Sequence, residues 1–401
     1  MKISIGLSLS LSGEYAAMGR EAEPAIRLFI ADANASTALR VNGERCDFAL
    51  ECHDDASDPV RCADIYRSLC SDRRANIIFG PYSSRLTRVA APIAEQHGRL
   101  FINHGGADDE LYTHSYKLIV GILSPASDYM REFVNLLSNL RIWRKRVAIV
   151  TSKSSFARAV ASGLERAAIE RYARRHGVRI RVKWNGAFDS NSTPPQLFPA
   201  LIRNRIDALA SAGSYNHDLR VIRAIASSDL NILVLGCVAA GVRQFAQDLG
   251  ELAEGVVGPS QWESSVEISP TLGPSPAEFV RRMRNATTEV PDYPAAQIYA
   301  AGLITAAAIA SSPSLDDIDL RAAFNDLRTT TMFGDFSIDR VTGRQLGHKM
   351  LLVQWQRGRK VIIHPEAHTN TGLHDSLPGW RLLLAGAEML GLTHRDDSNE
   401  K

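Results

Sequence analysis

Strand-like and helix-like patterns alternate along most of the sequence, and this alternation limits the possible folds more than any other feature. Apolar runs over 2–10, 46–54 and 75–80 are each followed by a segment with helical spacing. The pattern restarts near residue 127, so the chain contains two series of four or five strand–helix repeats. Because such repeats form parallel sheets covered by helices on both faces, the sequence predicts an α/β fold with two doubly wound lobes.

Length and charge agree with a two-domain chain and narrow its partners. The 401 residues exceed what one hydrophobic core usually organises. Lys and Arg number 46 and Asp and Glu 44, so the net charge of +2 gives no reason to expect a nucleic acid or an anionic membrane as partner. The most apolar segment, 300–310, is expected to be too short and too rich in alanine to span a bilayer, which takes about 20 residues.

The N-terminus and the cysteines bear on the compartment. Met1 and Lys2 lead directly into a strand-like run, so we expect either a cytosolic chain or an exported protein shown without its leader. The five cysteines are odd in number and form no CxxC pair, which favours free, buried thiols. The acids of "CHDD" at 52–55 are expected to begin a loop, because the sequence has no cluster with the spacing of metal ligands. We therefore expect no bound metal.

Motifs that carry enzymatic chemistry in α/β proteins are missing. The sequence contains no GxGxxG after its first strand, no GxxxxGK[ST], no GxSxG and no HExxH. His104 and His217 both fall at strand ends, where we expect them to form hydrogen bonds or orient a ligand rather than act as catalytic bases. The chain is therefore predicted not to be an enzyme and to need no cofactor.

Several segments together resemble one known family, the periplasmic solute-binding proteins of branched-chain (Leu/Ile/Val) amino-acid ABC transporters. Each motif alone is loose, but their order and spacing along nearly the whole chain are specific. The segments are 5–34, 54–69, 77–98 ("IIFGPYSSRLTRVAAPIAEQHG"), 146–165, 253–262, 294–310 and 333–343.

This resemblance implies two α/β lobes joined by three crossovers, and a hinge motion that closes the lobes around a ligand. Lobe one would comprise roughly 1–120 and 258–330, and lobe two 121–257 and 331–365; a tail from 366 to 401 is expected to pack on the body. It also implies a periplasmic location and a membrane permease that reads the closed state.

The resemblance also implies a binding site at the start of the helix 84–96. Ser84 stands four residues after Gly80, and in the family a serine at this place holds the ligand carboxylate. A helix N-terminus favours an anion for physical reasons, although an ordinary N-cap would use the same residue type. Ser83 is its neighbour, and the next loop brings the backbone of Gly105 and Gly106 to the same place, since glycine permits close approach.

Two positions depart from the pattern of the amino-acid-binding members. Ala107 stands where those proteins have a threonine, and Val238 stands where they have a carboxylate that pairs with the ligand ammonium. A desolvated ammonium without a counter-charge costs several kcal/mol. Asp108, Asp109 or Glu14 are alternative sources of that charge. We expect a small carboxylate without a free ammonium, aromatic or branched aliphatic.

The remaining candidates are apolar or aromatic residues at loop ends, which would clamp the body of such a ligand. His104 would add a hydrogen-bond donor to an anion or a phenol. The clamp residues are Tyr15, Met18, Tyr82, Phe156 and Tyr215.

A second class of function stays open beside the importer receptor. A cytosolic small-molecule sensor of the amide-receptor type, which acts by protein–protein contact, would share this fold. The missing leader and the five thiols favour the sensor, whereas the overall sequence pattern favours the transporter.

Overall fold

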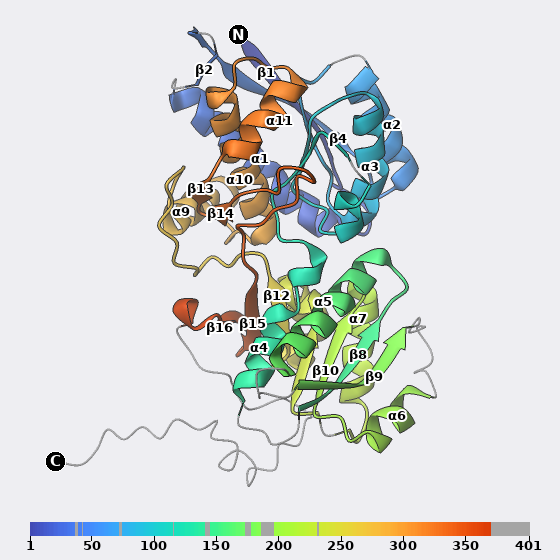
Figure 1. Ribbon diagram of the computed structural model, residues 1–401. Coiled ribbons are helices and arrows are strands. Elements are labelled where there is room, and N and C mark those ends of the chain that lie inside the picture. Colours follow the sequence, from blue (N-terminus) through green and yellow to red (C-terminus); the bar gives the residue numbers. More distant parts are fainter. Residues whose placement is uncertain are drawn as a thin grey trace, which may run out of the picture. The chain divides into compact units, whose positions relative to one another are not determined.

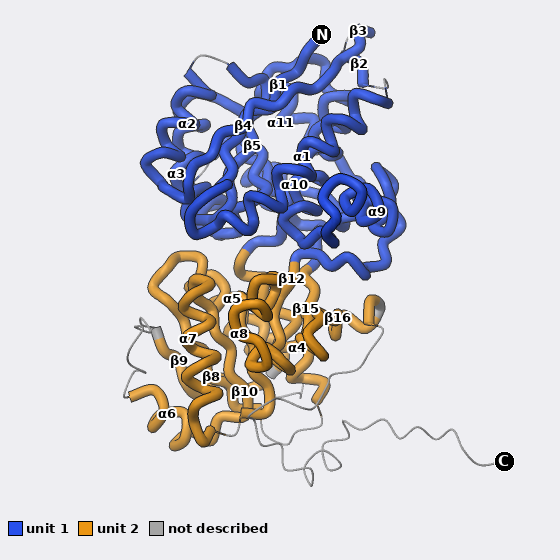
Figure 2. Tube along the Cα trace, turned by 180° about the vertical axis from the view of Figure 1, so that it is seen from behind, with its two compact units in different colours: residues 1–125, 261–349 blue, residues 126–260, 350–401 orange. Residues whose placement is uncertain are grey.

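The computed structural model describes residues 1–36, 39–41, 43–71, 74–114, 116–140, 145–172, 178–185, 196–230 and 232–369. The chain forms two compact units (Figure 2). Unit 1 contains residues 1–125 and 261–349, and unit 2 contains residues 126–260 and the chain from 350 onward. The chain therefore passes between the units three times, which is the connectivity of the predicted three-crossover fold.

Unit 1 is built on a parallel sheet of five strands. Its strands, in sheet order, are β4 (Asp47–Asp54), β1 (Lys2–Leu9), β5 (Ile77–Phe79), β6 (Phe101–Asn103) and β7 (Ile119–Gly121). Ile3, Ile5 and Leu7 are fully buried, and so is Ser8 on the opposite face of the same strand. Along β1 the apolar residues alternate with Ser and Gly, so small side chains lie on the second buried face.

Helices cover both faces of this sheet (Figure 1). Helices α2 and α3 lie on one face, and α1, α10 and α11 lie on the other. Ile78 and Phe101 pack into the cluster formed with α2 and α3, so Phe79 and Ile102, the neighbours of these residues in the two strands, face the α10 side. The helices of unit 1 are α1 (Ala16–Ser36), α2 (Pro59–Ser71), α3 (Ser84–Gln96), α9 (Pro276–Thr287), α10 (Tyr293–Ser311) and α11 (Asp317–Asp326), with the short η1 (Asp109–Tyr112).

Helix α10 contains the apolar segment 300–310. It has 19 residues, and within the described part of the chain it is the one helix long and apolar enough to cross a membrane. However, 72% of its apolar window is buried inside the protein. A Cβ at Gly302 would meet the ring of Phe29 at 2.4 Å, so α10 packs tightly against α1. Its apolar character is that of a core helix.

Unit 2 is built on a sheet of seven strands. The last two strands along the chain lie at one edge of the sheet and form antiparallel pairs. In sheet order the seven strands are β16 (Arg359–His364), β15 (Leu351–Gln356), β12 (Val257–Ser260), β11 (Val234–Cys237), β10 (Ala208–Ala212), β8 (Lys145–Thr151) and β9 (Val178–Asn185). Strands β15 and β16 form a hairpin that turns at Arg357 and Gly358, which have φ of 52° and 72°.

Helices and short helical turns lie between and after the strands of unit 2. They are η2 (Ala126–Asp128), α4 (Arg131–Asn139), α5 (Ser155–Tyr172), α6 (Leu197–Arg203), α7 (Tyr215–Ala226), η3 (Val238–Gly241), α8 (Gln244–Leu249), η4 (Gly250–Ala253) and η5 (Glu366–His368). Helix η5 lies against β16. The rest of the tail that was expected to pack on the body, from residue 370 to 401, lies outside the described residues.

Residues 331–349 lie in unit 1, whereas the sequence assigned 331–365 to the second lobe. Long-range hydrogen bonds hold this segment there. The amide of Gly121 donates to the carbonyl of Gly343 at 2.8 Å, and the side chain of Gln345 donates to the carbonyl of Ile122 at 3.0 Å. Such pairings join residues more than two hundred positions apart, and spacing along the chain does not reveal them. The same unit holds two small antiparallel pairs: β2 (Arg40–Val41) with β3 (Glu44–Arg45), and β13 (Thr329–Thr331) with β14 (Gly334–Phe336).

One polar cluster in unit 1 joins the chain segments that lead to all three crossovers. The side-chain amide of Gln261 accepts from the backbone N–H of Ser124 and donates to its carbonyl, both at 3.1 Å. Ser124 Oγ lies 2.7 Å from Nδ1 of His348, whose ring stacks on Phe333 at 4.3 Å. Burial lowers the pKa of His348 to about 4, so its imidazole is neutral at neutral pH.

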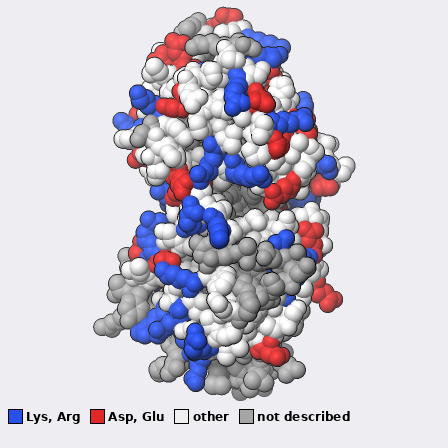
Figure 3. Space-filling model, turned by 90° about the vertical axis from the view of Figure 1, so that its right-hand side faces the viewer, with Lys and Arg blue, Asp and Glu red and all other residues white. Residues whose placement is uncertain are grey.

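The surface is mixed in charge. On the face shown in Figure 3, basic and acidic side chains are interspersed. This distribution agrees with the near-balance of 46 basic and 44 acidic residues in the sequence.

Candidate functional site

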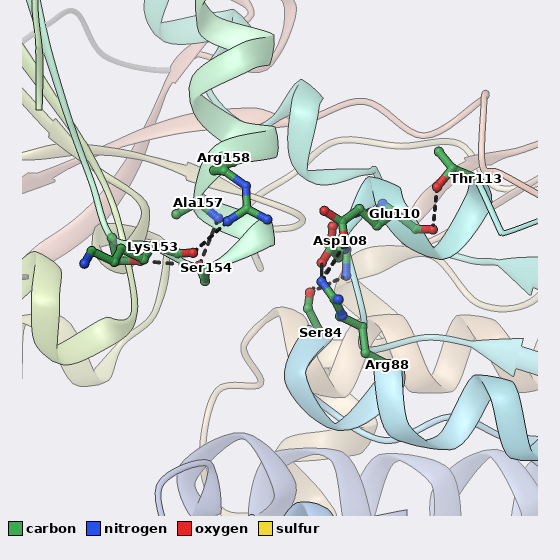
Figure 4. A network of polar contacts seen from close by, with 11 residues as sticks. Ser84, Arg88, Asp108, Glu110, Thr113, Lys153, Ser154, Ala157 and Arg158 are labelled. Carbon is green, nitrogen blue, oxygen red and sulfur yellow. Dashed lines mark hydrogen bonds and ion pairs between the residues drawn. The ribbon is translucent and has the colours of Figure 1, made fainter. Parts of the chain in front are cut away.

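Ser84, the first residue of α3, joins the two loops that were predicted to hold a ligand. Its Oγ accepts hydrogen bonds from the backbone N–H groups of Ala107 at 3.0 Å and of Asp108 at 3.2 Å (Figure 4). The serine oxygen therefore acts twice as an acceptor. The hydroxyl hydrogen remains to be donated, and no acceptor for it is found among the described residues.

Ser83 occupies the N-cap position of α3 but does not cap the helix with its side chain. Its Oγ is buried and has no hydrogen-bond partner within the described part of the chain. The backbone bond from Thr87 to the Ser83 carbonyl, at 2.8 Å, is the usual first bond of a helix. The first-turn N–H groups of α3 are thus without a side-chain cap, and an uncapped N-terminus is the helix end that favours an anion.

The glycines of the second loop are required for close approach. A Cβ at Gly105 would lie 2.4 Å from the carbonyl oxygen of Pro81, and one at Gly106 would lie 2.5 Å from Oγ1 of Thr87. The N–H of Gly106, however, donates to Oδ1 of Asn103 at 2.8 Å, so it serves the loop itself. Both glycines let the second loop lie against the first, and a backbone contact of Gly105 with ligand stays a prediction.

His104 is fully buried at the end of β6, and neither ring nitrogen has a hydrogen-bond partner among the described residues. Burial lowers its pKa to about 4, and the carbonyls of Gly80 and of His104 itself act weakly in the opposite direction. Neither carbonyl meets the geometry of a hydrogen bond with the ring. The ring lies 6.2 Å from that of Phe79. At neutral pH it is a neutral imidazole with one donor and one acceptor.

Aromatic side chains from three elements meet beside Ser83. The hydroxyl of Tyr82 lies 2.6 Å from that of Tyr293, the first residue of α10, and burial raises the pKa of Tyr82 to about 12. Tyr15 packs edge-on against Tyr82 with ring centroids 6.0 Å apart, and Met18 is half-buried on α1. The sequence reasoning missed Tyr293; the "PDYP" stretch that starts α10 is the local signal that marks it as a helix end.

Each of the three acids considered as an ammonium partner has an arginine beside it. The nitrogen–oxygen distances are 3.2 Å for Arg88 with Asp108, 3.5 Å for Arg344 with Asp109 and 3.7 Å for Arg85 with Glu14. Asp108 is also fully buried, and the guanidinium of Arg88 donates to Glu110 at 2.7 Å as well (Figure 4). These carboxylates are therefore already neutralised by protein cations.

In unit 2, the N-termini of α5 and α7, which follow β8 and β10, are capped by serine side chains. Ser154 accepts the N–H of Ala157 at 3.1 Å at the start of α5 (Figure 4), and Ser214 accepts the N–H of His217 at 3.3 Å at the start of α7. The guanidinium of Arg158 donates to the carbonyl of Lys153 at 2.7 Å. These ends therefore have the hydrogen bonds that α3 lacks.

Two predicted clamp residues of unit 2 are half-buried at these helix starts. Phe156 packs edge-on against Tyr129 with centroids 5.4 Å apart. The hydroxyl of Tyr215 donates to Asp248 at 2.7 Å, and burial together with that carboxylate raises the pKa of Tyr215. Each presents part of an aromatic ring to solvent, and a contact with ligand stays a prediction.

Val238 begins η3, and a buried carboxylate that the sequence reasoning missed lies next to this turn. Asp218 is fully buried, accepts the N–H of Ala239 at 3.0 Å, and accepts the hydroxyl of Ser211 at 2.8 Å. His217 Nδ1 lies 3.5 Å from the same carboxylate. Asp218 fixes the turn after β11 to the start of α7, a structural role that occupies both of its oxygens.

The acids of "CHDD" hold a loop, as expected. Asp55 is fully buried and accepts the hydroxyls of Ser8 and Ser10, each at 2.6 Å. Asp54 accepts the backbone N–H groups of Leu11 and Ala56. The cysteines are free; Cys52 is half-buried and the other four are buried. Burial raises the thiol pKa of Cys52 and of Cys62 to about 12, so these are unreactive thiols.

Known proteins share both sequence pattern and fold with this chain. Residues 2–360 match the family described as periplasmic binding protein. An ABC transporter substrate-binding protein from Desulfitobacterium hafniense in complex with Leu is 18% identical, with a TM-score of 0.75 over 90% of this chain and 100% of the other.

Two further solved structures hold aromatic acids. A solute-binding protein from R. palustris in complex with benzoate is 18% identical, with a TM-score of 0.71 over 90% of this chain and 95% of the other. One from Rhodopseudomonas palustris BisB5 in complex with 3,4-dihydroxy benzoic acid is also 18% identical, with a TM-score of 0.70 over 95% of this chain and 99% of the other. At these identities the likeness establishes the fold.

Proposed function

The chain belongs to the periplasmic binding protein family, and on that premise we propose that it is the substrate-binding component of an ABC importer for a small carboxylic acid without an ammonium group. The family and fold are those of solute-binding receptors, not of enzymes, which confirms the receptor interpretation of the sequence. The ligand class, the permease and the periplasmic location of this chain are the proposed parts.

The observation that carries the proposal is the start of α3. Its N-cap side chain makes no capping bond, and the hydroxyl of Ser84 is left with a hydrogen to donate. A carboxylate placed there would accept that hydrogen and first-turn N–H groups, and it would meet the positive end of the helix dipole.

The acids of the structure argue against a ligand ammonium. In unit 1, Asp108, Asp109 and Glu14 each have an arginine partner. In unit 2, the position of the carboxylate in amino-acid-binding members is held by Val238, and both oxygens of nearby Asp218 are engaged. A bound α-amino acid would bury its ammonium without a free counter-charge, at a cost of several kcal/mol.

The comparison structures show that this fold accommodates both kinds of ligand. One of them is in complex with Leu and another is in complex with benzoate, at the same 18% identity to this chain. The choice between the two therefore depends on side chains of this chain. The neutral His104, the aromatic Tyr15 and Tyr82 and the paired carboxylates favour an aromatic or branched aliphatic acid.

A ligand that binds both units when they are close together would shift the hinge equilibrium toward the closed state, which the permease would read. The cluster of Ser124, Gln261 and His348 supports a hinge of this kind, because it ties the segments leading to all three crossovers to one another.

A thermal-shift screen tests the proposed ligand class. The panel should contain leucine, valine and phenylalanine, their 2-oxo analogues, 4-methylpentanoate, and benzoate with its hydroxylated derivatives. We expect the unfolding temperature to rise with acids that lack an ammonium, since a ligand that binds the folded state stabilises it by mass action. A rise with leucine or valine alone would overturn the proposal.

The free thiols favour a second candidate, a cytosolic sensor that acts by protein–protein contact. Five free cysteines are more typical of a reducing compartment than of an oxidising one. Immunoblotting of periplasmic and cytoplasmic fractions of the native cells separates the two candidates. Recovery in the cytoplasmic fraction would favour the sensor, and recovery in the periplasmic fraction would favour the importer receptor.

A further inference from the structure

We propose that Ser83 and His104 form a second polar subsite beside the carboxylate position, which recognises a hydroxyl group on the body of the ligand. This inference rests on the proposed function, because it takes a carboxylate at the start of α3 as its fixed point. It adds a substrate class, hydroxylated monocarboxylic acids, and two residues that would determine specificity.

The two residues lie on loops that are in direct contact. Strands β5 and β6 pair in parallel, and the N–H of Gly80 donates to the carbonyl of Ile102 at 2.8 Å, so the loops leave the sheet side by side. A Cβ at Gly105 would come within 2.8 Å of Cα of Tyr82. Ser83 follows Tyr82 and His104 precedes Gly105. Both residues therefore extend from the junction of the two loops at the carboxyl end of the sheet.

Three buried polar atoms at this junction have no partner among the described residues. They are Oγ of Ser83 and both ring nitrogens of His104. Buried polar atoms are nearly always paired, because a group that loses its bonds to water must regain them elsewhere. By contrast, the neighbouring polar groups of the same loops are engaged: Ser84 with Ala107 and Asp108, and Asn103 with Gly106 and Tyr112.

The chemistry of the unpaired atoms selects a hydroxyl group as the partner. A neutral imidazole offers one donor and one acceptor, and a serine hydroxyl offers both. A hydroxyl group on the ligand can accept from one and donate to the other. A second carboxylate fits poorly, because it accepts only and His104 stays neutral in this buried place. An ammonium fits poorly as well, because neither residue carries a negative charge.

Calorimetric titration with matched acids tests the proposal. The probes are benzoate, 3-hydroxybenzoate, 4-hydroxybenzoate and 3,4-dihydroxybenzoate, together with 4-methylpentanoate as an aliphatic acid without a hydroxyl. For the wild-type protein, we expect at least one hydroxylated acid to bind about tenfold more tightly than benzoate, the gain of one or two hydrogen bonds to buried groups.

Variants then assign the gain to the two residues. Ser83→Ala and His104→Phe should reduce the hydroxyl preference, the ratio of the two affinities within each variant, to about twofold or less. His104→Gln keeps a donor and an acceptor and should retain part of the preference. Thr305→Val is the matched control: it removes another fully buried hydroxyl without a partner, on α10, and should leave the preference unchanged.

The outcomes separate this inference from the proposed function. If none of the acids binds to the wild-type protein, the proposed function fails, and this inference fails with it. If the acids bind but a hydroxyl brings no gain, or if the gain survives in Ser83→Ala and His104→Phe, the inference alone fails and the unpaired atoms have another role, such as binding water. Thermal unfolding of each variant checks the fold, and Ser83→Ala, the mildest change, carries the test if His104→Phe does not fold.

Discussion

The loop edges of the two units use similar residues in opposite ways. In unit 1, Ser83 stands at the start of α3 without capping it, and His104 on the next loop is buried with no partner among the residues that the structure describes. In unit 2, Ser154 and Ser214 cap α5 and α7, and Asp218 is satisfied by its neighbours. Since hydrogen bonds left unmade inside one chain are available to a ligand, the comparison supports the proposal that polar recognition lies in unit 1.

From the same contrast we propose that unit 2 contributes apolar rather than polar contacts to ligand binding. Its predicted clamp residues, Phe156 and Tyr215, offer aromatic surface, and its buried Asp218 bonds to Ser211 and Ala239 of the same unit. Ser84 and Asp218 show the difference most clearly, because both tie two loops together by accepting backbone N–H groups. Only Ser84 keeps a hydrogen to donate.

The largest expected effect is on stability, from removal of the carboxylate in unit 2. Asp218→Ala leaves the N–H of Ala239 and the hydroxyl of Ser211 unpaired in the interior. We expect the free energy of unfolding to fall by about 3 kcal/mol, as for loss of a buried charged hydrogen-bond acceptor. Urea denaturation followed by circular dichroism measures the change.

A control in the same unit makes this result specific. Asp248→Ala removes the partner of the Tyr215 hydroxyl at an exposed contact, and it should cost less than about 1 kcal/mol. If Asp218→Ala were as stable as wild type and instead lost ligand binding, Asp218 would be a ligand group and the contrast between the units would break.

Acid should destabilise unit 1 through its two buried neutral histidines. Burial lowers the pKa of His104 and of His348 to about 4, against an ordinary value of 6.5. Between these values the unfolded chain binds protons that the folded chain does not, so stability falls as pH falls from 6.5 to 4 and then levels off. The expected loss is about 3 kcal/mol for each histidine.

Urea denaturation at a series of pH values from 7 to 4 measures this loss. Carboxylates also contribute below pH 5, so the wild type is compared with His348→Phe and His104→Phe to isolate the histidines. In each variant, the part of the pH dependence of stability that the two histidines cause should fall by roughly half. The charged groups that act on His348 are Asp335 and Lys349, with opposite effects on its pKa. A wild-type slope unchanged in both variants would show that neither histidine is held neutral.

A smaller effect is expected on affinity, from a pair of serine variants. Ser84→Ala removes the donor to the ligand carboxylate and should weaken binding of benzoate, or of the tightest acid in the screen, about tenfold or more. Because the bonds to Ala107 and Asp108 are lost as well, the unfolding temperature should drop by a few degrees without loss of the fold.

Ser154→Ala is the matched change in unit 2, since it removes a helix-capping serine that bonds only within its own loop. It should cost about 1 kcal/mol of stability and leave affinity nearly unchanged. Equal losses of affinity in both variants would show that recognition is not concentrated in unit 1.

Much of the fold follows from local pattern. The strands of the two sheets and the start of α3 at Ser84 are set by apolar periodicity and helix signals, which depend on neighbouring residues. The position of residues 331–349 depends instead on long-range bonds such as that of Gly121 with Gly343, whereas the family resemblance assigned these residues to the other lobe.

In the candidate site, too, features that depend on neighbouring residues were predicted, and features that depend on distant residues were not. Ser84, Gly105 and Gly106 were found from their places after strands, and the resemblance gave them roles. Tyr293 and Asp218 were missed, because their significance comes from partners far along the chain, Tyr82 in one case and Ala239 in the other. The unpaired state of Ser83 and His104 is a property of packing, and residue type alone does not reveal it.

A crystal structure of the complex with the tightest-binding acid tests the central claim most directly. We predict the ligand carboxylate at the N-terminus of α3, within hydrogen-bond distance of Oγ of Ser84, with no cationic group on the ligand facing a protein carboxylate. A carboxylate bound instead at the start of α5 or α7, or an α-amino acid whose ammonium pairs with an acid of either unit, would contradict the account.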